Sequence, residues 1–342
     1  MKNITKTGLT ALAGSLVMVS AQAVDLSMTG ALKSIFSTQN NPVAGTEATN
    51  GKGLSLDTDF NFRASGELDN GFTVGYHMQV DTDGALSATS SQLTIGMGSL
   101  GTVQVNDRGG SKANSIDDIT PHAYNETWDS LSTVNPSSFG SRTSSGSIEY
   151  RMPAQELMGT TVNASVLYDP NAGVGQITEG SVGSSSVSGQ AYTLQIAHES
   201  GLEFGSGYES VDDDAGKLLG SGTTEAIAYL KYAVGGLSVA YQEAYTDSVS
   251  GTGTEGADVE TSFMGVAYTA GDVTVSYGES SKQIAAVSDT VVGLESELES
   301  LQVAYVMGAM TISAAMSETS NADGLTATDK YEENTLAVAF AF

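Results

Sequence analysis

Side chains suited to catalysis are scarce in this sequence. It has no cysteine, and its three histidines are His77, His122 and His198. Neither the G-x-S-x-G motif of serine hydrolases nor the H-E-x-x-H motif of zinc proteases occurs in the chain. His77 could lie near Asp57 or Asp59, but no oriented nucleophile accompanies it. We therefore predict that the protein is not an enzyme.

One segment matches a nucleotide-binding pattern. Residues 251–256 fit G-x-G-x-x-G, which cradles phosphates where a strand leads into a helix. No such strand–helix unit precedes these residues, so we interpret them as a flexible loop.

Two acidic runs, at residues 81–83 and 212–214, offer the oxygen ligands that Ca²⁺ and Mg²⁺ prefer. Neither run matches an EF-hand, and acidic runs are more often solvated than liganded. We predict that the protein has no cofactor, and we keep Asp212, Asp213 and Asp214 as candidate ligands for a divalent cation on an acidic loop.

The chain is strongly acidic, with 40 Asp and Glu residues against 13 Lys and Arg residues. Nucleic-acid binding needs a basic surface, so this composition excludes nucleic acid as a partner. It also argues against a polybasic surface that binds anionic lipid.

The N-terminal residues form the three parts of a bacterial secretory signal. Lys2 and Lys6 supply the positive region, residues 9–19 the apolar region, and residues 21–23 (Ala-Gln-Ala) the cleavage site. We predict that residues 1–23 are removed during export and that residues 24–342 form one domain. No segment after residue 23 approaches the ~20 apolar residues of a membrane-spanning helix.

Apolar and polar residues alternate almost without a break in the segment 54–68. Leu54, Leu56, Phe60 and Phe62 fall on one side, and charged or polar residues such as Asp57 fall on the other. A period of two indicates a β-strand with one apolar and one polar face. The pattern recurs along the chain with no helical segment left to cover the apolar face, so lipid is the simplest environment for that face.

Sixteen such strands can be counted. They span residues 25–38, 53–67, 71–82, 90–98, 101–108, 143–153, 159–169, 189–199, 201–211, 223–234, 236–246, 259–269, 271–281, 294–307, 309–319 and 330–342. Short turns alternate with long polar loops, which is the arrangement of an outer-membrane barrel. We therefore predict an all-β, sixteen-stranded antiparallel transmembrane β-barrel, whose interior is too wide for side chains to fill and is a water-filled channel.

Three strands alternate less regularly than the others. They are the tenth, twelfth and fourteenth, at residues 223–234, 259–269 and 294–307. Either these strands face another subunit, or their predicted register is off by one residue.

The predicted loop 109–142 is much longer than the others and contains the only tryptophan, Trp128. Loops of this length are uncommon unless functional. Our hypothesis is that this third long loop folds inward and narrows the channel, its carboxylates facing cations of the pore wall. The alternative is an external flap whose acids are merely solvated. The predicted constriction acids are Asp117, Asp118, Glu126 and Asp129, and the predicted pore-wall residues are Lys33, Asp57, Asp59, Arg63 and His77.

Several features together resemble the Gram-negative general diffusion porins, most closely those of the Rhodobacter type. They are the signal peptide, the opening VDLSMTGALKSIF, the sixteen-strand layout, the long loop after the fifth strand, and the terminal Phe342. Segments similar to GFTVGYHMQVDTDG and SLGTVQVNDRGG precede the inward-folded loop in that family. Phe342 resembles the terminal aromatic that the outer-membrane insertion machinery reads.

The resemblance implies a homotrimer in the Gram-negative outer membrane with a pore for small hydrophilic solutes. Family members carry a denser arginine cluster on the wall, and the few arginines of this chain favour an acidic lumen that prefers cations. Its other expected partners are outer-membrane lipid and lipopolysaccharide, whose phosphates divalent ions could bridge to the acidic loops. Two alternatives remain: a substrate-specific porin, or a structural or adhesive barrel with a blocked bore.

Overall fold

The computed structural model describes residues 25–40, 51–81, 87–127, 139–140, 143, 145–172, 187–212, 222–248, 258–284, 295–321 and 330–342. Residues 1–24, and with them the predicted signal peptide, lie outside this set, as does part of each predicted long loop. Among the described residues, no helix has the length and apolar character needed to cross a membrane.

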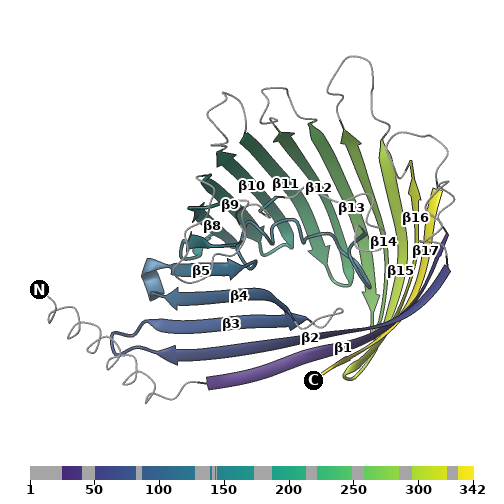
Figure 1. Ribbon diagram of the computed structural model, residues 1–342, viewed down its shortest axis with the longest axis horizontal. Coiled ribbons are helices and arrows are strands. Elements are labelled where there is room, and N and C mark those ends of the chain that lie inside the picture. Colours follow the sequence, from purple (N-terminus) through teal and green to yellow (C-terminus); the bar gives the residue numbers. More distant parts are fainter. Residues whose placement is uncertain are drawn as a thin grey trace, which may run out of the picture.

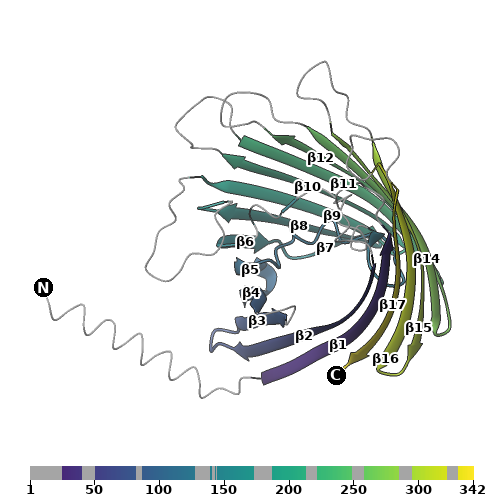
Figure 2. The same cartoon turned by 45° about the vertical axis from the view of Figure 1, so that its right-hand side comes forward.

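The chain forms one closed antiparallel sheet (Figures 1 and 2). Apart from β6 and β7, which both pair with β8, consecutive strands pair with each other, and β1 also pairs with β17 and so closes the barrel. The strands are β1 (Asp25–Asn40), β2 (Gly51–Glu67), β3 (Thr73–Asp81), β4 (Ser87–Gly96), β5 (Thr102–Arg108), β6 (Ser147–Arg151), β7 (Gln155–Leu157), β8 (Thr160–Asp169), β9 (Gly189–His198), β10 (Leu202–Asp212), β11 (Gly222–Val234), β12 (Leu237–Ser248), β13 (Val259–Ala270), β14 (Val273–Ile284), β15 (Ser296–Met307), β16 (Met310–Ser320) and β17 (Lys330–Ala341), with a 3₁₀ turn η2 at Gly98–Leu100.

The seventeen segments amount to sixteen strands, because β6 and β7 are two halves of one strand. Both pair with β8, and they are separated by Met152, Pro153 and Ala154. Proline cannot donate a ladder hydrogen bond, which accounts for the interruption. The fold prediction is confirmed in its strand number and closure. The predicted turn at residues 153–159 is shorter in the structure, where Met158 and Gly159 make the turn with φ values of 50° and 76°.

The closing seam extends to the last residue. The main-chain N–H of Gly30 donates to the carbonyl of Phe342 at 2.8 Å, and the N–H of Phe342 donates to the carbonyl of Gly30 at 3.0 Å. A Cβ atom at Gly30 would lie 2.8 Å from the Phe342 ring, so glycine leaves space for that ring. The ring also packs edge-on against Phe60, with 5.9 Å between centroids.

Side chains on the two faces of the barrel differ as the alternation predicts. On β15, Leu301, Val303 and Tyr305 are exposed, whereas Gln302 and Ala304 between them are buried. The same exposed apolar face recurs on the neighbouring strands, for example at Val275 and Leu336. We call the exposed apolar face outward and the opposite face inward.

The outward face also carries a row of carboxylates toward one end of the strands. Glu279 pairs with Glu299, Glu299 with Glu318, and Glu318 with Glu332 on four consecutive strands from β14 to β17. Like charges directly opposite one another are destabilising in a sheet. We call these four residues the outward glutamate row. On these strands the apolar band ends at this row.

The apolar outward face leads to a prediction about a charged side chain placed on it. Val303 is outward and 41% exposed, between Leu301 and Tyr305. We expect Val303→Arg to lower the free energy of unfolding in lipid vesicles by about 2–4 kcal/mol, because arginine is costly at the lipid-facing midplane. Urea titration of the refolded barrel measures this value, with Val303→Leu as the control. Equal stability of both variants would contradict a lipid-facing position.

Candidate functional site: the inward wall and the loop after β5

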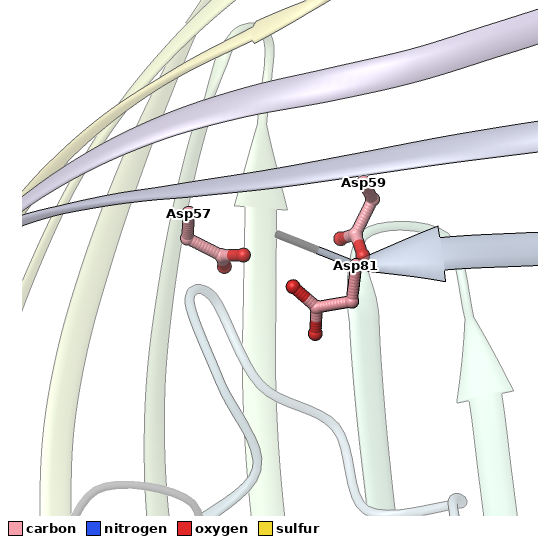
Figure 3. A group of neighbouring side chains, drawn as sticks. All are labelled: Asp57, Asp59 and Asp81. Carbon is pink, nitrogen blue, oxygen red and sulfur yellow. The ribbon is translucent and has the colours of Figure 1, made fainter. Parts of the chain in front are cut away.

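Three carboxylates converge on the inward wall of β2 and β3 (Figure 3). Asp57 and Asp59 are two residues apart on β2 and share a face, and Asp59 is directly opposite Asp81 at the end of β3. One carboxylate oxygen from each of the three residues lies within 4.8 Å of those from the other two. The side-chain amide of Gln79 donates to Asp59 at 3.0 Å. We call Asp57, Asp59 and Asp81 the acidic triad. Such a concentration of negative charge attracts cations from solution.

The predicted wall cation Lys33 is paired with this wall. Its Nζ lies 2.9 Å from Oδ2 of Asp57 and 5.9 Å from the ring centroid of Tyr124, which belongs to the loop after β5. The prediction placed Lys33 opposite loop carboxylates, whereas the structure gives it a carboxylate of the neighbouring strand.

Arg63 and His77 face each other across β2 and β3. The ring nitrogens of His77 lie 2.8 Å from Oε1 of Gln92 and 2.9 Å from Oδ1 of Asn61. These contacts join His77 to the polar wall, beside Arg63 and two residues from Gln79. The five predicted wall residues therefore lie on the same inward surface of β1–β3, and their role in a pore stays a prediction.

The loop after β5 is fastened at its beginning to β6. Glu149, which is fully buried, accepts a hydrogen bond from the main-chain N–H of Lys112 at 2.8 Å. Its other carboxylate oxygen lies 2.6 Å from Arg151, whose guanidinium also donates to the carbonyl of Gly110. The sequence prediction missed this pair, because a Glu and an Arg two residues apart on a strand give no signal of a loop contact.

Apolar contacts hold the middle of the loop. Ala113, Ile116, Ile119 and Phe139 are buried in one cluster with wall residues of β8, β9, β11 and β12. The wall members of this cluster are Leu167, Ala191, Ile227, Tyr229, Ala240 and Ala244. These wall residues are inward, so burial beneath the loop explains apolar side chains on a face that is otherwise polar.

Burial beneath the loop also explains the irregular alternation of β11, which is one of the three irregular strands. Ile227 and Tyr229 are inward and pack in the loop cluster. On β13, Phe263 is inward and buried, next to Gly265, where Pro121 of the loop approaches. Their register matches that of the neighbouring strands, so a one-residue error does not account for the pattern.

The predicted constriction acids that the structure describes, Asp117, Asp118 and Glu126, belong to the loop after β5. Asp117 is largely buried, and desolvation, with the nearby Asp118 and Glu225, raises its pKa to about 7. Burial likewise raises the pKa of Asp118, while its hydrogen bond to Glu126 opposes the shift. Glu126 is buried and accepts a hydrogen bond from Thr120 at 3.2 Å. Asp129 lies outside the described residues.

Residues 121–127 reach β13–β15, far from the strands that begin and end the loop (Figure 1). The N–H of Ala123 donates to Oγ of Ser276 on β14 at 2.8 Å. The N–H of Tyr124 donates to Oε1 of Gln302 on β15 at 2.8 Å, and Nε2 of Gln302 donates to the carbonyl of Asn125 at 2.7 Å. Sequence reasoning missed these wall residues, since Ser and Gln are ordinary on a polar inward face.

The candidate metal ligands are not brought together in the described structure. Asp212 ends β10, where Ser188 donates to its carboxylate at 3.3 Å, and Asp213 and Asp214 lie outside the described residues. Within the described ranges, the acidic triad is the one group of three possible ligands, so a divalent site at residues 212–214 stays a prediction.

A sequence profile described as Gram-negative porin matches residues 8–293 of this chain. No curated protein gives a match.

Solved structures are similar along almost the whole chain. A refined porin structure has 15% identity and a TM-score of 0.65, covering 93% of this chain and 100% of that one. OmpF of Salmonella typhi, in complex with daunomycin, has 12% identity and a TM-score of 0.67, covering 93% and 97%. The trimer form of in-vitro folded OmpT of Vibrio cholerae has 11% identity and a TM-score of 0.63, covering 94% and 100%. At these identities the similarity shows a shared fold.

Docking of the loop is expected to depend on pH through Asp117. Its pKa rises from 3.8 to about 7 on burial, so the docked loop holds a proton that a released loop loses between these values. Docking is therefore strongest below about pH 4 and weakens as the pH rises to about 7.

We expect Asp117→Asn, which has no proton to lose, to reduce amide hydrogen exchange of residues 113–119 at about pH 8 after correction for intrinsic rates. At about pH 4 the variant and the parent should exchange alike. Asp212→Asn serves as the control. An identical effect of Asp117→Asn at both pH values would contradict the assignment.

Proposed function

Because this chain belongs to the Gram-negative porin family, whose members are channels of the outer membrane, we propose that it conducts small hydrophilic solutes and ions by passive diffusion and prefers cations. The observation that carries the cation preference is the acidic triad of Asp57, Asp59 and Asp81 on the inward wall. In a water-filled bore, fixed charges of one sign raise the concentration of the opposite ion.

The pairing of the nearby wall cations supports the same sign of selectivity. Lys33 is in contact with Asp57, and Arg151 with the buried Glu149. Each of these two cations is offset by a neighbouring carboxylate, so neither adds net positive charge beside the bore.

We further propose that the loop after β5 narrows the bore. Three sets of contacts support this role: with Glu149 at the beginning of the loop, with the apolar inward cluster in its middle, and with Ser276 and Gln302 at residues 123–125. All the wall side chains in these contacts are inward. A loop held in this way occupies part of the interior and leaves the acidic triad beside the remaining space.

Assembly and environment are part of the proposal. A homotrimer is supported by the trimer form of the similar OmpT of Vibrio cholerae, and lipid contact by the exposed apolar outward face. Export with removal of residues 1–23 is supported by the three-part signal. We further propose that divalent cations bridge outer acidic residues to lipopolysaccharide phosphates. The large excess of Asp and Glu residues over Lys and Arg residues supports this proposal.

The first test measures selectivity. We expect Asp57→Asn, Asp59→Asn and Asp81→Asn together to lower the cation-to-anion permeability ratio at least roughly threefold to fivefold, because even one unit charge at 4 Å in water contributes about 1 kcal/mol. The reversal potential in a KCl gradient across a planar bilayer gives this ratio.

The matched control removes three charges from the outside of the barrel, by Glu279→Gln, Glu299→Gln and Glu332→Gln. It should leave the ratio nearly unchanged, since exposed charges are screened within roughly 8–10 Å. A parent channel that favours chloride would refute the cation preference.

The second test removes the loop. We expect deletion of residues 115–132 to raise the single-channel conductance, because the segment occupies part of the interior. Deletion of residues 251–256, in a predicted outer loop, is the control. An unchanged conductance after the first deletion would exclude a constriction by this loop.

A further inference from the structure

Resting on the proposed constriction, we propose that Gln302 is the positioning residue that fixes residues 123–125 of the loop and thereby holds Tyr124 against Lys33. Gln302 is inward on β15 and only 3% exposed. It faces the main chain of the loop, so its contacts constrain the backbone path whatever side chains the loop carries.

The side-chain amide of Gln302 matches both kinds of main-chain group. Its oxygen accepts from the N–H groups of Tyr124 and Asn125, at 2.8 and 3.3 Å, and its nitrogen donates to the carbonyl of Asn125 at 2.7 Å. A second bond from the nitrogen to Ser300 fixes the orientation of the amide. Among the uncharged side chains of similar length, only glutamine supplies both a donor and an acceptor.

The neighbouring wall is shaped to receive the loop. Gly265 and Gly278 are directly opposite each other on β13 and β14. A Cβ atom at Gly265 would lie 3.0 Å from Pro121, and one at Gly278 would lie 2.2 Å from the Thr127 hydroxyl. Side chains at these two positions would therefore push the loop away from the wall at Pro121 and Thr127, on either side of the residues that Ser276 and Gln302 bind.

Residues 123–125 also approach β1, which is separated from β15 by β16 and β17 in the closed sheet. Tyr124 holds its ring 5.9 Å from Nζ of Lys33 on β1, and Lys33 is bonded to Asp57 of the acidic triad. The segment thus lies between β14–β15 and β1, and any shift of its main chain moves Tyr124 relative to the triad. Through Tyr124, Gln302 therefore sets the position of the loop beside the acidic triad.

The test compares Gln302→Met with Gln242→Met. Both residues are inward and buried, but neither amide atom of Gln242 has a hydrogen-bond partner among the described residues. Loss of three hydrogen bonds, each contributing roughly a twofold to tenfold factor, should shift the loop toward released states. We expect Gln302→Met to raise open-channel noise and conductance toward the values of the 115–132 deletion, and Gln242→Met to leave both unchanged.

A chemical readout follows the loop itself. The sequence has no cysteine, so Asn125→Cys provides a single label site while keeping the main chain that Gln302 binds. We expect at least a tenfold faster reaction of this cysteine with a charged methanethiosulfonate reagent in Gln302→Met. Gln302→Glu, which keeps the acceptor and loses the donor, should fall between the parent and Gln302→Met.

Rescue distinguishes positioning from folding. A disulfide between Ala123→Cys and Ser276→Cys replaces the lost contacts, so the oxidised tether should return Gln302→Met to the noise and conductance of the tethered parent. Reduction should restore the variant behaviour. If Gln302→Met does not assemble alone, it is folded with the tether closed and measured before and after reduction.

Two failures can be told apart. If the 115–132 deletion raises conductance while Gln302→Met matches Gln242→Met in noise, conductance and labelling, Gln302 does not position the loop. If the deletion leaves conductance unchanged, the constriction fails, and the labelling rates alone decide whether Gln302 holds residues 123–125.

Discussion

A membrane-spanning sheet must satisfy every main-chain hydrogen bond within itself, because hydrocarbon offers none in return. In this protein the pairing of β1 with β17 meets that requirement, from Ala31 opposite Ala341 to Asn40 opposite Glu332. Gly30 and Phe342 extend the ladder through the last residue. Closure leaves no free edge, and it also creates an interior with a surface of its own. The chemistry of the protein is placed on that interior surface.

The interior is not uniformly polar, and the difference follows the loop after β5. Where the loop lies against the wall, several inward side chains are apolar or small, as at Ile227, Leu167 and Gly265. On β2 and β3, the inward residues are polar and include Asp57, Asp59 and Asp81. The inside of the barrel therefore has one side covered by the loop and another side that carries these three carboxylates.

The sequence was sufficient for the architecture because a period of two repeats on every strand. It predicted the number of strands and the closure of the barrel. It also predicted that Lys33, Asp57 and Asp59 lie on the inward face. It did not predict that β6 resumes as β7 beyond Pro153, since a proline after a strand usually signals its end. The irregular alternation of β11 and β13 follows from the apolar inward residues Ile227 and Phe263, and a contact of these strands with another subunit stays a prediction.

Loop contacts were beyond reach for a different physical reason. Gln302 and Ser276 bind main-chain atoms of residues 123–125, and main-chain groups leave no trace in a sequence pattern. Asp81 was visible as the last polar residue of its strand, but its approach to Asp59 depends on the β2–β3 register. The sequence thus identifies most of the wall, while partners brought together by register or by backbone need the folded barrel.

The outward glutamate row also bears on the surrounding bilayer. On β14 the outward apolar residues run only from Val273 to Tyr277 before Glu279, whereas on β2 they extend from Phe62 to Leu54 with one interruption at Thr58. The hydrophobic height of the barrel is thus unequal around its circumference. Lipid chains that meet a short hydrophobic wall compress or tilt to match it. We expect the membrane to be thinner beside β14–β17 than beside β2. Because thinning the bilayer costs free energy, other membrane proteins should associate preferentially with one side of the barrel.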